Sequence, residues 1–202
     1  MFKLVKRLLV LGLIVGAFYV GAVYSDKCEL QNQVLRLHVV GDSDSAEDQS
    51  VKLKVRDALL SELETLLAKV DTKEEAQALI ETKLDQLKQV ADQVLSSCGL
   101  TDTAQITLDR EEFDTRVYDT FTLPAGVYDA LRVTIGSGEG KNWWCVVFPG
   151  LCVPAASEQV EDVAAGAGFS EELSGAITGK QEYRVRFLLL DWMGRLENYL
   201  RK

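Results

Sequence analysis

The sequence predicts an α+β fold that follows an apolar amino-terminal helix. Apolar and polar residues alternate at 35–39 and in several runs between 106 and 148, which is the period of strands. Apolar residues recur every three or four positions over 46–98 and 181–200, which is the period of amphipathic helices. We therefore expect a strand, an antiparallel helical pair, a mainly antiparallel sheet of two hairpins, and a carboxy-terminal helix.

The amino-terminal segment, residues 1–25, has the layout of a signal peptide or membrane anchor. An uncharged apolar run from Leu8 to Ser25 follows three basic residues, Lys3, Lys6 and Arg7. At about 1.5 Å per residue the run reaches roughly 27 Å, close to the hydrocarbon thickness of about 30 Å. The residues leave cleavage near Ser25 and retention as an anchor as open alternatives. In both cases the basic end stays in the cytoplasm and the rest is exported.

Residues 26–202 are predicted to form one extracytoplasmic domain. A chain of 202 residues with 47% hydrophobic residues and 3 prolines can build one core of ordinary size. Without the first 25 residues, the net charge changes from −9 to −12, with 19 basic against 31 acidic residues. Such an acidic surface repels phosphate backbones, so we expect no nucleic-acid partner.

The first strand, at 35–39, should bury its odd-numbered residues on one face and end at Gly41. Mixed pairing by this strand is allowed. Two capping boxes then mark helix starts, formed by Ser45 with Asp48 and by Thr72 with Glu75. Because the turn between the helices is short and Gly99 ends the second, the two should pack as an antiparallel pair.

Two hairpins are predicted in the middle of the chain. A strand at 116–123 should return through a turn at 124–126 into a strand at 127–135. The glycine-rich loop GSGEGK, residues 136–141, should then lead into a strand at 143–148. The loop lacks the first glycine and the Ser or Thr of a phosphate-binding loop, and positive φ in a hairpin explains its glycines.

Residues 154–180 have weak periodicity and are predicted to be a loosely structured connection to the closing helix. That helix, at 181–200, is interrupted by Gly194. Because residues 183–189 also alternate, a strand there is the alternative.

The four cysteines allow three disulfide pairings. We favour Cys145 with Cys152, since a strand end that returns over the FPGL turn would bring them close. Cys28 with Cys98 is then the second candidate pair, and its alternative is two unpaired thiols. A CxxC spacing is absent, so a thiolate metal site is not expected.

His38 is the only histidine, and it lies beside Arg36 and ahead of an acidic turn at 42–48. We expect His38 and Arg36 to bond Asp42, Asp44 or Asp57 across this turn as a structural polar network. The turn does not fit a calcium loop, because Glu47 stands where glycine is needed. The alternative function is a cell-envelope hydrolase that uses His38 and the acidic turn from Asp42 to Asp48.

Two stretches carry a resemblance to a known family. They are LRLHVVGDSDSAEDQSVKLKVRD at 35–57 and LPAGVYDALRVTIGSGEGKNWWCVVFPGLC at 123–152. In this order and spacing they resemble the stage II sporulation protein R family, and the tail after Pro154 matches least. The resemblance implies a secreted signalling protein, exported from the forespore into the space between two membranes. It implies that the partner is a membrane-embedded aspartic protease, which this protein activates to process the mother-cell sigma factor E precursor.

The resemblance and the residues together predict a protein that is not an enzyme and needs no metal or cofactor. Trp143 and Trp144 are adjacent in a strand and must face opposite ways, so one can fill the core while the other contacts a partner. The candidate partner-binding residues are those in the two stretches that folding alone does not explain: Arg36, His38, Asp42, Asp44, Asp48, Lys141, Asn142, Trp143 and Trp144.

Overall fold

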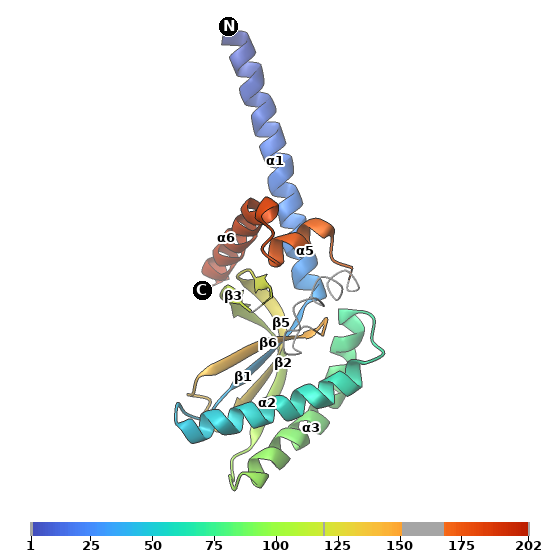
Figure 1. Ribbon diagram of the computed structural model, residues 1–202, viewed down its shortest axis with the longest axis vertical. Coiled ribbons are helices and arrows are strands. Elements are labelled where there is room, and N and C mark those ends of the chain that lie inside the picture. The colour runs from blue at the N-terminus through green and yellow to red at the C-terminus, as the bar shows by residue number, and fades with distance from the viewer. Residues whose placement is uncertain (1, 119, 151–167, 202) are drawn as a thin grey trace.

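The computed structural model describes residues 2–118, 120–150 and 168–201 (Figure 1). The described helices and strands are α1 (Phe2–Gln33), β1 (Leu35–Val40), α2 (Ala46–Leu67), α3 (Lys73–Ser97), β2 (Ala104–Phe113), β3 (Arg116–Val117), β4 (Thr122–Leu123), β5 (Gly126–Ile135), β6 (Asn142–Phe148), α5 (Glu171–Ile177), the 3-10 helix η1 (Gln181–Tyr183) and α6 (Arg184–Arg201). This order of elements confirms the α+β class.

A four-stranded mixed sheet with the order β2-β5-β1-β6 forms the centre of the fold. The first strand, β1, runs parallel to β5 and antiparallel to β6, and β5 pairs antiparallel with β2 over its whole length. All six residues of β1 are buried, because helices cover both faces of the sheet. The expectation that this strand is buried on one face only was therefore wrong.

The two predicted hairpins do not form. The segment expected as one strand, 116–123, divides into β3 and β4, which pair only with each other. β5 and β6 are not neighbours, since β1 lies between them. The loop at 136–141 therefore crosses the end of β1 rather than joining adjacent strands. Alternation correctly indicated the strands at 127–135 and 143–148, but the central place of β1 decides which strands pair.

The helical pair α2 and α3 covers one face of the sheet, as predicted (Figure 1). The pair is antiparallel, because Lys54 approaches Cys98 while Glu62 accepts a hydrogen bond from Gln86. Ser45 and Thr72 cap the two amino termini as the capping boxes predicted. The cluster beneath the helices is aliphatic and includes Leu37, Leu59, Leu87 and Leu131.

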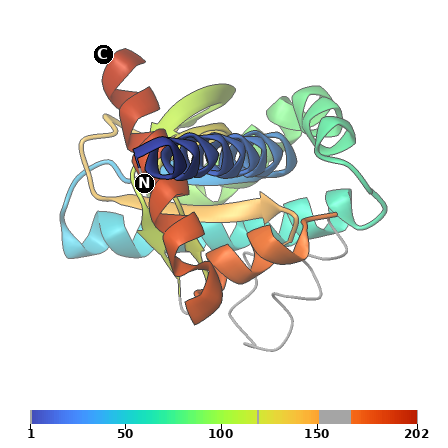
Figure 2. The same cartoon turned by 90° about the horizontal axis from the view of Figure 1, so that it is seen from above.

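The end of α1, together with α5 and α6, packs on the other face of the sheet (Figures 1 and 2). This second cluster is richer in aromatic residues and contains Phe113, Tyr128 and Leu190. Residues 181–201 are helical, which confirms the closing helix and excludes the strand alternative there. Of the predicted loose connection at 154–180, residues 171–177 are helix α5, which Ser170 caps, and 154–167 lie outside the described residues.

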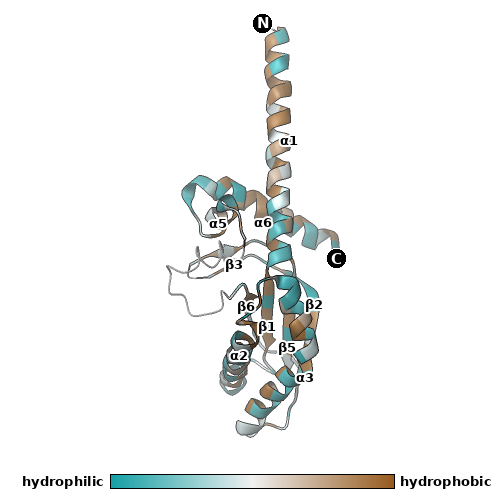
Figure 3. Cartoon of the chain, turned by 90° about the vertical axis from the view of Figure 1, so that its right-hand side faces the viewer, coloured by the Kyte–Doolittle hydropathy of each residue, from teal (hydrophilic) through white to brown (hydrophobic). Residues whose placement is uncertain are grey.

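Helix α1 is continuous from the apolar segment into the fold (Figure 3). Its first two-thirds is exposed and apolar, and α1 is the one described helix whose length and composition suit a membrane span. Beyond that segment it packs against α6 and β5, with Val23 and Leu30 fully buried. The helix therefore passes Ser25 without a break and ends only at Gln33.

Candidate partner-binding site

Two loops meet at the end of the sheet that lies away from the amino terminus of α1 (Figure 1). We call residues 41–45 and 136–141 the distal loop pair. Backbone hydrogen bonds join them: the Gly140 amide donates to the Gly41 carbonyl at 2.9 Å, and the Glu139 amide donates to the Asp42 carbonyl at 3.0 Å. The two stretches that carry the family resemblance are therefore in direct contact here.

Acidic side chains fix this contact. The Ser137 amide donates to Asp42 Oδ1 at 2.6 Å, and the Lys141 amide donates to Asp44 Oδ1 at 2.7 Å. Hydrogen bonds from Ser137 lower the pKa of Asp42, because they stabilise its charged form. Lys52 adds a hydrogen bond from Nζ to the Lys141 carbonyl at 2.8 Å. The acids of the turn thus hold the glycine-rich loop in place.

Glycine is required in the loop for space as well as conformation. Gly136 and Gly138 have φ of 56° and 68°, in the left-handed region. A Cβ on Gly140 would overlap the carbonyl oxygen of Ser43 and lie 2.8 Å from that of Gly41. Asp48 has a different role. Its amide donates to Oγ of Ser45, the cap of α2, at 3.0 Å, and its carboxylate accepts hydrogen bonds from the Ser43 and Ser45 hydroxyls.

His38 does not contact the acidic turn, so the expected polar network was wrong. Its Nδ1 lies 2.7 Å from Glu111 Oε2, and its Nε2 lies 2.8 Å from Asn142 Oδ1. Burial raises the pKa of Glu111, but the hydrogen bond and charge of His38, with Arg132, outweigh this and lower it. Because both ring nitrogens of His38 are occupied, the arrangement that the hydrolase alternative requires does not form.

Arg36 is fully buried on the same side of β1 as His38. Its Nη2 donates to the Tyr118 hydroxyl at 2.9 Å, and its guanidinium carbon lies 3.8 Å from the centre of the Phe113 ring. Burial lowers the pKa of Arg36. Its Nε and Nη1 have no hydrogen-bond partner in the part of the chain that the structure describes. Arg36 is therefore a core residue and not an accessible contact for a partner.

Trp143 and Trp144 face opposite sides of the sheet, as alternation predicted. Trp143 packs on the aliphatic cluster beneath the guanidinium of Arg56, whose carbon is 4.7 Å from its ring centre. Trp144 stacks on His38 and lies under Arg116, at 3.4 Å. Both rings are half-buried, so neither is free to anchor a partner.

The expected second disulfide does not form, because Cys28 and Cys98 are both free. The amino terminus of α3 lies beside the end of α1, where Lys73 Nζ donates to the Gln31 carbonyl at 3.0 Å. Cys98 lies at the other end of α3, whose 25 residues place it roughly 37 Å from the amino terminus of that helix and therefore far from the end of α1. The pairing of Cys145 with Cys152 stays a prediction, because Cys152 lies outside the described residues.

Of the nine predicted contact residues, Asp44, Lys141 and Asn142 are exposed, and all three lie at or beside the distal loop pair. The side chain of Asn142 is hydrogen-bonded to His38, so the side chains of Asp44 and Lys141 are the ones left facing solvent.

Sequence reasoning missed Glu111, Tyr118 and Ser137 as partners of His38, Arg36 and Asp42. No local pattern could have found them, since each is more than 70 residues distant. Among the described residues, no group of His, Cys, Asp and Glu side chains could hold a metal ion.

The profile described as Stage II sporulation protein R matches residues 31–158, which include both stretches and the distal loop pair. The chain belongs to this family. It is 32% identical to Stage II sporulation protein R of Bacillus subtilis (strain 168) over 186 residues, covering 83% of each chain. No solved structure matches the chain significantly. The family match ends before α5 and α6, so the carboxy-terminal helix lies outside the profile.

Proposed function

We propose that this protein is an exported sporulation signal that activates a membrane-embedded aspartic protease, which then processes the mother-cell sigma factor E precursor. Membership of the stage II sporulation protein R family carries the proposal. The site supports it in one respect. The polar residues at the ends of the matched strands are used to join two loops into one surface, which suits recognition better than chemistry.

The architecture gives this surface a direction. The apolar segment of α1 and the distal loop pair lie at opposite ends of the molecule (Figure 1). If α1 is retained in one membrane, the distal loop pair points away from that membrane. A signal that crosses the space between two membranes needs this orientation, because its receptor lies in the opposite membrane.

The mechanism that fits a non-catalytic activator is a shift in the protease population. The protein would bind the active arrangement of the protease, such as its dimer, more tightly than the inactive one. Moving a protease from 1% to 99% active requires a preference of about 10,000-fold, or about 5.5 kcal/mol. That preference has to come from contacts that only the active arrangement makes, because equal binding to both arrangements would shift nothing.

Co-expression with the candidate protease and its precursor, followed by a blot for the cleaved precursor, tests the proposal. Wild type should produce the cleaved form, and omission of the protein should abolish it. If cleavage is the same with and without the protein, the proposed activation is wrong.

Lys141→Glu tests the distal loop pair separately. The backbone of Lys141 makes the structural hydrogen bonds while its side chain is exposed, so the variant should fold. We expect about tenfold less cleaved precursor, equivalent to about 1.4 kcal/mol of binding. Lys69→Glu makes the same charge change on an exposed residue after α2 and serves as the matched control. Equal losses in both variants would mean that charge, and not this surface, matters.

A further inference from the structure

Helix α6 carries an apolar stripe that no described residue covers. Its members are 41% to 76% exposed: Val185, Leu188, Trp192, Leu196 and Tyr199. At 100° per residue they fall within an arc of about 80° on one side of the helix. Scattered apolar residues on a surface are ordinary, but a continuous stripe along about four turns marks an interaction surface.

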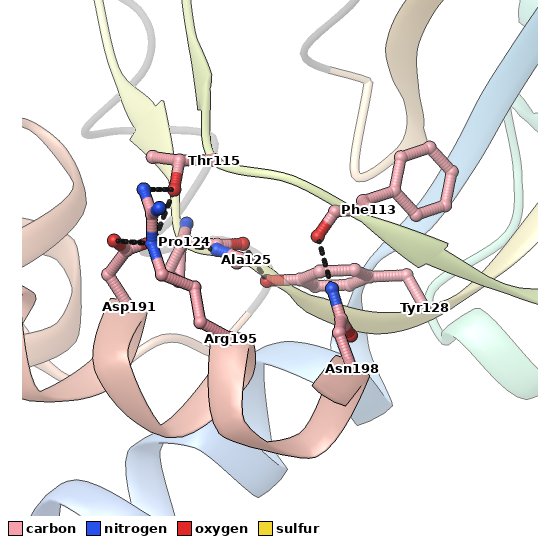
Figure 4. A network of polar contacts seen from close by, with 8 residues as sticks. All are labelled: Phe113, Thr115, Pro124, Ala125, Tyr128, Asp191, Arg195 and Asn198. Carbon is pink, nitrogen blue, oxygen red and sulfur yellow. Dashed lines mark hydrogen bonds and ion pairs between the residues drawn. The ribbon is translucent and has the colours of Figure 1, made fainter. Parts of the chain in front are cut away.

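The opposite side of α6 is fixed to the fold, so the stripe cannot rotate inward. Asp191 accepts hydrogen bonds from the Ala125 amide, at 2.9 Å, and from Thr115, while Asn198 donates to the Phe113 carbonyl at 3.0 Å (Figure 4). Gly194 packs so closely on Ala125 that a Cβ would overlap its carbonyl. With this side bound to the strands, the stripe faces away from the sheet.

The direction away from the sheet is also the direction in which the apolar part of α1 projects (Figures 1 and 2). α6 crosses α1 where the apolar run ends: Arg186 pairs with Asp26, and Lys27 pairs with Glu197 at 2.8 Å. An apolar run long enough to span a bilayer therefore stops at the level of α6. If the run is inserted, the stripe meets the interface of the same membrane.

The chemistry of α6 suits this position. Trp and Tyr are enriched at membrane interfaces, and the stripe includes one of each. The stripe contains no acidic residue, and the exposed Arg184, Arg195 and Arg201 lie on the same helix. A groove of about 500 Å³ opens between α1 and α6, with Leu196 and Leu200 beside Arg110 and Arg201 in its wall. The one acid in this wall, Glu197, is paired with Lys27. Apolar surface flanked by basic residues is typical of helices that lie in the headgroup region.

We propose that α6 lies in the plane of the membrane that α1 enters, with its stripe of Val185, Leu188, Trp192, Leu196 and Tyr199 in the lipid interface. The partner of this surface is a lipid bilayer. Attachment by both a spanning and an in-plane helix fixes the orientation of the domain, which a single helix would leave free to tilt. The proposal requires an inserted α1, and it does not depend on activation of a protease.

Tryptophan quenching by brominated lipid tests the proposal on the full chain. The protein is reconstituted in vesicles of phosphatidylcholine and phosphatidylglycerol, with or without bromine on the upper part of the acyl chains. We expect bromine to quench wild-type fluorescence and Trp192→Phe to lose most of that quenching. Trp143→Phe is the matched control and should retain it, because Trp143 packs on the α2–α3 face.

Two results would overturn the proposal. Equal quenching of wild type and Trp192→Phe would show that Trp192 does not approach lipid. Absence of quenching in wild type would show that the stripe is covered by something else, such as a second copy of the chain. Trp192 is 58% exposed, so Trp192→Phe should fold.

Discussion

The two faces of the central sheet are built in different ways. The α2–α3 face is an aliphatic cluster, in which two capped helices bury regular stripes against β1, β5 and β6. The α1–α6 face contains buried Arg36 and His38 among aromatic rings, and ion pairs and single hydrogen bonds join its helices. The first face needs only apolar area, whereas the second depends on specific geometry between distant residues.

This difference indicates that the two faces have different structural roles. The α2–α3 face stabilises the sheet, and the α1–α6 face sets the angle of the domain to the apolar segment of α1. It also explains why six of the ten apolar residues of α6 can remain exposed. Their side of the helix is not needed for folding, because Leu190, Gly194 and the polar contacts already attach α6 to the strands.

Gly194→Ala should have the largest effect, on the α1–α6 face alone. In an ordinary helix, replacing glycine by alanine stabilises by up to about 1 kcal/mol. Here the methyl group would overlap the backbone of Ala125, so α6 must move, and we expect a loss of about 4 kcal/mol or more. Urea unfolding of the detergent-solubilised chain measures the loss of stability, and hydrogen exchange should show that the amides of α6 are exposed while those of α2 stay protected.

Arg195→Ala is the control. Arg195 lies on the exposed side of α6, so this change should cost less than about 1 kcal/mol. A stable Gly194→Ala protein would mean that α6 is not packed this closely.

Leu37 and Arg36 are neighbours on β1 that face the two clusters, and both are fully buried. Leu37→Ala should cost about 3 kcal/mol, because it leaves a cavity in the aliphatic cluster. Arg36→Met should cost nothing or stabilise by up to about 4 kcal/mol, since it removes a buried charge with two unsatisfied groups. Urea titration of the two variants and wild type compares their free energies of unfolding. If Arg36→Met is as damaging as Leu37→Ala, the contacts of the guanidinium with Tyr118 and Phe113 stabilise the fold by more than its burial costs.

Glu111→Gln should have the smallest effect, and it should depend on pH. The pKa of Glu111 is lowered below its ordinary 4.5, so its contribution to stability is present at neutral pH. That contribution is lost as the pH falls from about 5 through the lowered pKa. We expect the variant to be less stable than wild type by about 1 kcal/mol at pH 7, and the difference to shrink as the pH falls through the lowered pKa. A difference that stays constant as the pH is lowered until wild type unfolds with acid would show that the charge of Glu111 is not the cause.

The sequence by itself determined the long helices α2, α3 and α6, and the caps of α2 and α3. A helix needs only local contacts, so apolar spacing and the Ser45–Asp48 and Thr72–Glu75 boxes were sufficient for α2 and α3. The same local reasoning found the apolar run of α1 and placed Trp143 and Trp144 on opposite faces. The two stretches at 35–57 and 123–152 also carry the family resemblance without reference to any tertiary contact.

Only the tertiary structure decided which strands pair and what the polar residues contact. Alternation assigns a residue to a face but carries no information about the neighbouring strand, so the insertion of β1 between β5 and β6 was not predictable. That insertion brings His38 to Glu111 and Asn142, and leaves Asp42 and Asp44 to hold the glycine-rich loop. Likewise, the stripe on α6 has the spacing of a core helix. Its exposure follows from contacts of Asp191, Gly194 and Asn198 with residues 66 to 85 positions away in the chain, which periodicity cannot show.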